Sequence, residues 1–214
     1  MKTASIALIL IFALVGMGCS TTTERSRNLA DPSISGETLA QQVCSNCHGI
    51  DGNSVNQNFP KLAGQQKEYL VAQLKQFKSH GRFDPPGFEY MWGLSRSLTD
   101  KQIDELATYF SRQKSLADKP GDGKREESGR DIFEHGVAVQ NIPACSTCHG
   151  MDAAGHGAFP RLAGQHADYT VKQLNVFQRT DERPEGAMMK VIAHNLTPDN
   201  IANVAAYLAT LSTK

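Results

Sequence analysis

The sequence predicts an all-α protein built from two tandem modules, and three observations carry that prediction. Apolar residues recur in both halves with the i, i+3, i+4, i+7 spacing of one buried helical face. A long stretch of the first half returns in the second half about 100 residues later, which indicates a duplication. No stretch alternates apolar and polar residues with the period of two that a half-buried strand requires.

The expected helices follow the same order in both halves: one before a cysteine motif, one in the middle and one at the end. They span 37–43, 67–79 and the segment after Thr99, and then 129–136, 166–179 and the segment after Thr197. Thr99 opens its helix with a capping box that includes Gln102. Thr197 is an N-cap followed by Pro198 at the first helical position. Both final helices are therefore well defined at their starts.

The repeat also sets the expected domain boundaries. F-P-K-L-A-G-Q at 59–65 returns as F-P-R-L-A-G-Q at 159–165. We expect a first domain over 34–115, a second over 126–214, and between them a linker over 116–125, which is charged and rich in turn formers. Each domain alone is small for an apolar core, so a rigid apolar group held at its centre would compensate.

Each module carries one C-x-x-C-H motif, which is typical of covalent c-type haem attachment. Two thiols one helical turn apart can add to the two vinyl groups of a porphyrin, and the adjacent histidine supplies a neutral imidazole nitrogen to the iron. A thioredoxin-like redox pair has no use for the histidine, and a zinc site would need thiolates from distant segments. We therefore expect two covalently bound haem c groups, attached through Cys44, Cys47, Cys145 and Cys148 and ligated by His48 and His149.

The second axial ligand of each iron is expected to be methionine. Met91 and Met189 each stand seven residues before the leucine that precedes the last helix of their module. Met188 is one position out of this register and is the alternative to Met189, while Met151 follows the proximal histidine too closely to reach the opposite haem face. A single methionine is ordinarily core filler. The equal register in both modules favours ligation by Met91 and Met189.

The other histidines have no counterpart in the opposite module, so we expect surface or capping roles for them. They are His80, His135, His156, His166 and His194. Pro60 and Pro160 follow the two proximal histidines at similar distances. Their carbonyl groups could accept the hydrogen bond from the second imidazole nitrogen, or the prolines could simply form a turn.

The N-terminal 1–18 segment indicates an export signal, because Lys2 precedes an apolar run that is too short to cross a bilayer. Cys19 follows this run, and the four haem cysteines leave it without a partner. We expect Cys19 to be lipidated and 19–33 to form a tether; ordinary cleavage nearby and an uncleaved anchor are the alternatives. The protein would then lie in the periplasm, attached to a membrane.

With these motifs the chain resembles the diheme class I cytochromes c, specifically the cytochrome c4 family. The resemblance covers about residues 34–214 and rests on both C-x-x-C-H motifs, the doubled F-P-[KR]-L-A-G-Q and the G-A-M-M-K before the last helix. It implies two tandem class I cytochrome c domains, each a small helical bundle around a covalent haem. It also implies a periplasmic carrier between a quinol–cytochrome c reductase and a terminal oxidase, and it favours the carbonyl role of Pro60 and Pro160.

We therefore expect an electron carrier rather than an enzyme, with redox proteins as partners and no small-molecule substrate. Lys plus Arg and Asp plus Glu each number 22, so nothing points to nucleic acid. The alternative is the cytochrome subunit of a periplasmic dehydrogenase complex. A diheme peroxidase or a thiosulfate-oxidising cytochrome is disfavoured, because two methionine ligands would leave no open position on the iron.

Overall fold

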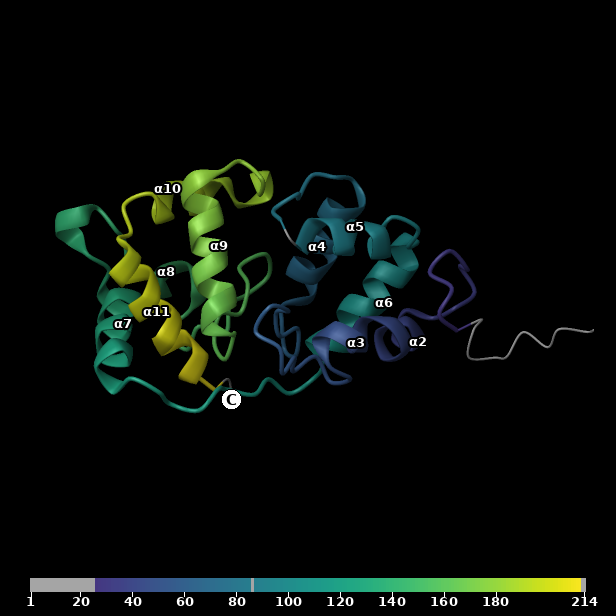
Figure 1. Ribbon diagram of the computed structural model, residues 1–214, viewed down its shortest axis with the longest axis horizontal. Helices are drawn as coiled ribbons and strands as arrows, with labels where there is room; N and C mark the ends of the chain where they lie inside the picture. The colour runs from purple at the N-terminus through teal and green to yellow at the C-terminus, as the bar shows by residue number, and fades with distance from the viewer. Residues whose placement is uncertain (1–25, 86, 213–214) are drawn as a thin grey trace, which may run out of the picture.

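The computed structural model describes residues 26–85 and 87–212, which form two helical lobes side by side (Figure 1). One extended segment joins the last helix of the first lobe, α6 (Asp100–Ser111), to the first helix of the second, α7 (Gly123–His135). The described residues contain no strand, only two isolated bridges. The all-α prediction is confirmed.

The first lobe begins with a helix that runs directly into the cysteine motif. Its elements are α2 (Gly36–Leu39), a π-helix (Ala40–Cys44), α3 (Ser45–His48), α4 (Lys67–Lys78), α5 (Gly87–Ser95) and α6. The π-helix follows α2 without a break, so the expected helix over 37–43 extends further to reach the motif. The capping box of α6 is present, because the side chains of Thr99 and Gln102 each accept from the backbone of the other.

The second lobe repeats this order with a different entry to its motif. Its elements are α7, a 3-10 turn (Ala138–Gln140), α8 (Ser146–His149), α9 (Ala167–Arg179), a 3-10 turn (Pro184–Gly186), α10 (Ala187–Ala193) and α11 (Pro198–Thr210). Helix α7 begins earlier than the expected 129–136, within the expected linker. The Asp122 side chain caps it by accepting from the backbone of Lys124 and Arg125. The charged residues there are good helix formers, which the linker interpretation overlooked.

The final helix of each lobe organises its core. In the first lobe, Ile103, Leu106 and Phe110 of α6 pack with residues of α2 and α4. In the second lobe, α11 packs against α7 and α9 and contributes to two apolar clusters. Burying such a side chain contributes about 1.5–3 kcal/mol. The stripes expected on both final helices therefore form the cores that hold the cysteine motifs.

Helices α5 and α10 were not predicted, yet they carry the candidate methionines. Helix α5 packs against α4, and α10 packs against α9. Helix α5 contains two glycines and lacks a clear apolar stripe, while α10 is short, so neither has the periodicity that reveals a helix. The expected export signal and Cys19 lie outside the described residues. Within the described part of the chain, no helix is long and apolar enough to cross a membrane.

Candidate metal centres

The proximal side of the first site is built by the helical run through the motif. Cys44 ends the π-helix, Cys47 and His48 lie in α3, and both thiols are free. His48 Nδ1 lies 2.9 Å from the Pro60 carbonyl oxygen. A carbonyl only accepts, so Nδ1 carries the proton and Nε2 keeps its lone pair for a metal. Burial lowers the pKa of His48, against the opposing effect of the Pro60 hydrogen bond, so the ring is neutral.

The second site repeats these features in α8. Cys145 and Cys148 are free thiols, and His149 Nδ1 donates to the Pro160 carbonyl oxygen at 3.0 Å. Burial lowers the pKa of His149, and His156 adds to this effect. The predicted carbonyl role of the two prolines is confirmed. Both histidines are thus held in the tautomer that an iron ligand needs.

The cysteines suit thioether formation better than metal coordination. Burial raises the pKa of the Cys44 thiol to about 12 and that of Cys145 to about 11, so neither is a thiolate at neutral pH. In the described part of the chain, no cluster of three or more His, Cys, Asp or Glu side chains could hold a metal ion. Free paired thiols beside a neutral histidine of fixed tautomer fit a covalent haem and not a zinc site.

The candidate distal methionines differ in their surroundings. Met91 lies half-buried in α5. Met189 of α10 is also half-buried and packs against a cluster that includes Phe177 and Ile201. Met188 and Met151 are 64% and 68% exposed. This placement favours Met189 over Met188, and the ligand assignment itself stays a prediction.

One histidine departs from its expected surface role. His80, His135, His156 and His194 are exposed, but His166 is only 4% exposed. Although His166 is the N-cap residue of α9, its side chain makes no capping hydrogen bond. Its Nε2 lies 2.9 Å from the Ser54 carbonyl oxygen in the other lobe, and its Nδ1 lies 3.4 Å from Asp118. The surface prediction for His166 is wrong because this residue lies in the contact between the lobes.

The doubled F-P-[KR]-L-A-G-Q motif forms the centre of that contact. Gln165 accepts from the Lys61 backbone N–H at 2.9 Å and donates to the Lys61 carbonyl at 3.0 Å. Gln65 does the same to Arg161, at 2.6 Å and 3.0 Å. These four residues are between 1% and 6% exposed. Each glutamine amide therefore clamps the backbone of one residue in the opposite lobe.

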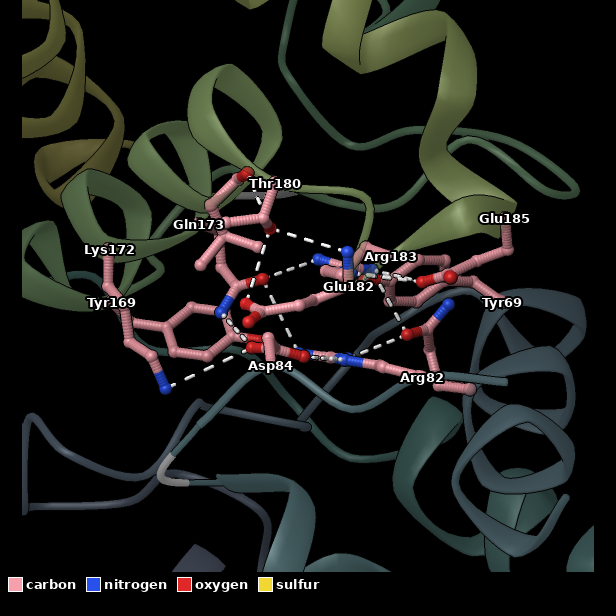
Figure 2. A network of polar contacts seen from close by, with 12 residues as sticks. Tyr69, Arg82, Asp84, Tyr169, Lys172, Gln173, Thr180, Glu182, Arg183 and Glu185 are labelled. Atoms are coloured by element: carbon pink, nitrogen blue, oxygen red, sulfur yellow. Dashed lines mark hydrogen bonds and ion pairs between the residues drawn. The ribbon is translucent and has the colours of Figure 1, made fainter. Parts of the chain in front are cut away.

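A second polar network also joins the lobes (Figure 2). Arg82 donates to Gln73 in its own lobe and to Gln173 in the other, and Arg183 likewise donates to both glutamines. The two arginines also lie over Phe77 and Phe177, one in each lobe. The network also includes Tyr69, Asp84, Tyr169, Lys172, Thr180, Glu182 and Glu185.

Each arginine of this network pairs with a carboxylate of its own lobe. Arg82 Nε lies 2.6 Å from Asp84, and Arg183 lies 2.9 Å from Glu185. Burial alone would raise the pKa of Asp84, but the hydrogen bonds and charge of Arg82 hold it below its usual value. Burial opposes the charge of Arg82, yet Tyr169 and Asp84 raise its pKa overall. Both groups are therefore ionised, and this buried ion pair of the first lobe lies at the contact with the second, where Lys172 Nζ is 3.9 Å from Asp84.

Sequence reasoning missed these interface residues, although their pattern was visible. The glutamine of the doubled motif was used only to detect the repeat. Arg82-x-Asp84 returns as Arg183-x-Glu185 with the same spacing as the cysteine motifs. This repeated charged pair could have revealed the interface, because the surrounding segment has no other regular pattern.

This chain is similar in sequence and in fold to known proteins. The family model described as cytochrome c matches residues 33–114 and again 127–212. Cytochrome c4 of Azotobacter vinelandii is 32% identical over 220 residues, which cover 99% of this chain and 100% of that protein. The crystal structure of reduced recombinant cytochrome c4 from Pseudomonas stutzeri has a TM-score of 0.74 at 34% identity, covering 82% of this chain and 96% of the other. A thiosulfate dehydrogenase electron acceptor of Stutzerimonas stutzeri is 33% identical, covering 84% of this chain and 83% of its own length.

Proposed function

Because this chain belongs to the cytochrome c family, as a diheme cytochrome c4 protein with two covalently bound haem c groups, we propose that it shuttles electrons between respiratory partners in the periplasm. The observation that carries the proposal is the duplicated proximal site. In both lobes a buried, neutral histidine is fixed by a proline carbonyl beside two free thiols. Such a site would hold an iron for reversible one-electron exchange, and a methionine as the second ligand would leave no open position for a substrate.

In this proposal each residue type has one task. Cys44, Cys47, Cys145 and Cys148 would form the thioether bonds, and the Nε2 atoms of His48 and His149 would bind the irons. Met91 and Met189 would each supply a thioether sulfur as the second protein ligand, which would raise the reduction potential. The haem supplies the one-electron chemistry, while the chain fixes its ligands and limits access of water. The exposed position of Met188 supports the choice of Met189.

The electron donor and acceptor define two candidate settings. The first is transfer from a quinol–cytochrome c reductase toward a terminal oxidase, as the family resemblance implies. The second is acceptance of electrons from a periplasmic dehydrogenase, which the likeness to a thiosulfate dehydrogenase electron acceptor favours. In both settings the partners are redox proteins. Reduction by membranes that contain the reductase, compared with reduction by a purified dehydrogenase, distinguishes the two.

Membrane attachment through a lipid on Cys19 is a further part of the proposal, supported by the position of this cysteine directly after the apolar run. Lipoproteins carry more than one acyl chain, which is enough for stable anchoring. The wild type should fractionate with membranes, and Cys19→Ser should release soluble protein. Soluble wild-type protein would refute the lipid anchor and leave the carrier role intact.

The carrier role is tested by carbon monoxide binding and a redox titration on the same sample. Two six-coordinate His/Met irons should bind carbon monoxide poorly, show negligible peroxidase turnover at neutral pH and exchange electrons reversibly. Stoichiometric carbon monoxide binding to either native haem would reveal an open coordination position. That result would move the protein from the carrier class to the enzyme class.

A further inference from the structure

One peptide unit links the proximal histidine of the first lobe to a side chain of the second. Its carbonyl oxygen, on Pro60, accepts from His48 Nδ1 at 2.9 Å. Its N–H, on Lys61, donates to Gln165 Oε1 at 2.9 Å. The peptide is therefore hydrogen-bonded at both ends, with the expected iron ligand on one side and the opposite lobe on the other.

The second lobe contains the mirror arrangement. The Pro160 carbonyl accepts from His149 Nδ1 at 3.0 Å, and the Arg161 N–H donates to Gln65 Oε1 at 2.6 Å. Each proximal histidine is thus connected, through a single peptide, to a glutamine of the other lobe. The two connections cross the interface in opposite directions.

We propose that Gln65 and Gln165 are positioning residues that tune the reduction potential of the haem in the opposite lobe. The inference rests on the proposed carrier function, because it assumes iron on His48 and His149. It extends that function by making each haem's potential depend on the contact between the lobes. The polar contact between the lobes then influences both reduction potentials in addition to holding the lobes together.

The direction of the effect follows from hydrogen-bond polarisation. An acceptor on the peptide N–H makes the carbonyl oxygen at the other end of the same peptide more negative, since hydrogen bonds in a chain strengthen one another. A more negative Pro60 oxygen draws the Nδ1 proton of His48 more strongly and makes the imidazole a better electron donor. A better donor stabilises ferric iron. Gln165 therefore lowers the potential of the first haem, and Gln65 lowers that of the second.

Burial and backbone geometry make these connections effective. The two glutamines and their partners Lys61 and Arg161 are almost fully buried, so water does not compete for the peptide N–H groups. Gly64 and Gly164, directly before the glutamines, have φ of 63° and 70°. A side chain is strained in this left-handed region, and a Cβ on Gly164 would also lie 3.1 Å from the Leu116 carbonyl oxygen. The motif glycine thus sets the turn from which each glutamine reaches across.

The test replaces one glutamine at a time in the full-length holoprotein. Gln165→Met and Gln65→Met keep the length of the side chain and remove the acceptor. Gln66→Met is the matched control, because the Gln66 amide also crosses the interface, to the Ala154 carbonyl at 2.8 Å. The Ala154–Gly155 peptide bonds only to the backbone carbonyl of His149 and not to its imidazole ring. Redox titration gives both potentials, which are assigned to each lobe by the hyperfine-shifted proton resonances of its proximal histidine.

The expected result is a crossed pattern. Gln165→Met should raise the first haem's potential and leave the second unchanged, and Gln65→Met should do the reverse. The equilibrium constant for reduction should change between about twofold and tenfold, the upper limit being ~59 mV for one electron. Gln66→Met should move neither potential. If Gln165→Met does not fold, Gln165→Asn, whose shorter amide cannot reach Lys61, should give the same upward shift.

Three outcomes would overturn the inference: unchanged potentials in both glutamine variants, shifts confined to the substituted lobe, or equal shifts in the Gln66→Met control. Each can occur in a protein that still transfers electrons reversibly and excludes carbon monoxide. A failure of the inference is therefore distinguishable from a failure of the carrier function, which carbon monoxide binding detects directly.

Discussion

The two lobes have equivalent proximal sites but differ in the charged side chains at the interface between them. Lys61 and Arg161 occupy equivalent positions in the doubled motif, and both are buried. Lys61 Nζ lies 2.6 Å from Asp118, whereas the described residues give Arg161 only carbonyl partners. Burial lowers the pKa of Arg161 to about 10. Both copies of the motif therefore keep the glutamine hydrogen bonds to the backbone, while the charged partners of Lys61 and Arg161 differ.

The same contrast appears in the second network. Asp84 is 1% exposed and accepts from Arg82 and Gln173, with Lys172 at 3.9 Å. Its counterpart Glu185 has a side chain that is 15% exposed and pairs with Arg183. The hydrogen bonds that fix the proximal histidines are common to both lobes, while the charged side chains around the interface differ. The two haems should therefore have distinguishable potentials.

The largest effect is expected from a variant that can attach only one haem. In a Cys145→Ala, Cys148→Ala variant the second lobe cannot form thioether bonds and should lose its covalent haem, while the first keeps its own. Intact-protein mass should show one haem instead of two. The paired control, Cys44→Ala with Cys47→Ala, should also keep one. Retention of both haems by either variant would refute the covalent assignment.

The next test compares the two arginines of the ionic network. Arg82→Met leaves the Asp84 carboxylate buried without its main partner, which should cost about 3–5 kcal/mol. Arg183→Met should cost less, about 2 kcal/mol, because Glu185 can reach water. Denaturant unfolding of the holoproteins, followed by circular dichroism, measures the difference. Equal losses would show that the two halves of the network are equivalent.

The comparison also explains how much the sequence could predict. The final helices and the cysteine motifs were predictable because caps, apolar stripes and ligand spacing are local signals. Helices α5 and α10 were not, since their position depends on packing against α4 and α9. The buried role of His166 was hidden for a related reason. A polar residue between two lobes has no periodicity that separates it from a polar residue at the surface.

A third test concerns the distal side of the second haem. Met189→Ala should abolish the thioether charge-transfer absorption of that haem and lower its potential, because the ligand that favours ferrous iron is lost. Met188→Ala should do neither, since Met188 is largely exposed. Absorption spectra of the oxidised proteins and redox titrations provide the measurement. The opposite result would transfer the ligand role to Met188.

The smallest effect is expected from a substitution that places the same residue type at two equivalent positions of the interface. His166 and Gln66 are equivalent residues, and each donates across the interface to a backbone carbonyl in the loop that follows the opposite proximal histidine, that of Ser54 or Ala154. In His166→Gln the new amide can keep the bond to Ser54, so only the 3.4 Å contact with Asp118 is lost. Asp118 also keeps Lys61 as its closer partner.

We therefore expect His166→Gln to change the free energy of unfolding by less than about 1 kcal/mol, the contribution of one ordinary hydrogen bond. His166→Leu removes both contacts, leaves the Ser54 carbonyl unpaired and should cost about 1–3 kcal/mol. Denaturant unfolding of the two holoproteins under identical conditions gives the comparison. If His166→Gln lowers the free energy of unfolding as much as His166→Leu does, the contact with Asp118 contributes more than the hydrogen bond to Ser54. The interface would then depend on a contact that only one of the two equivalent residues makes.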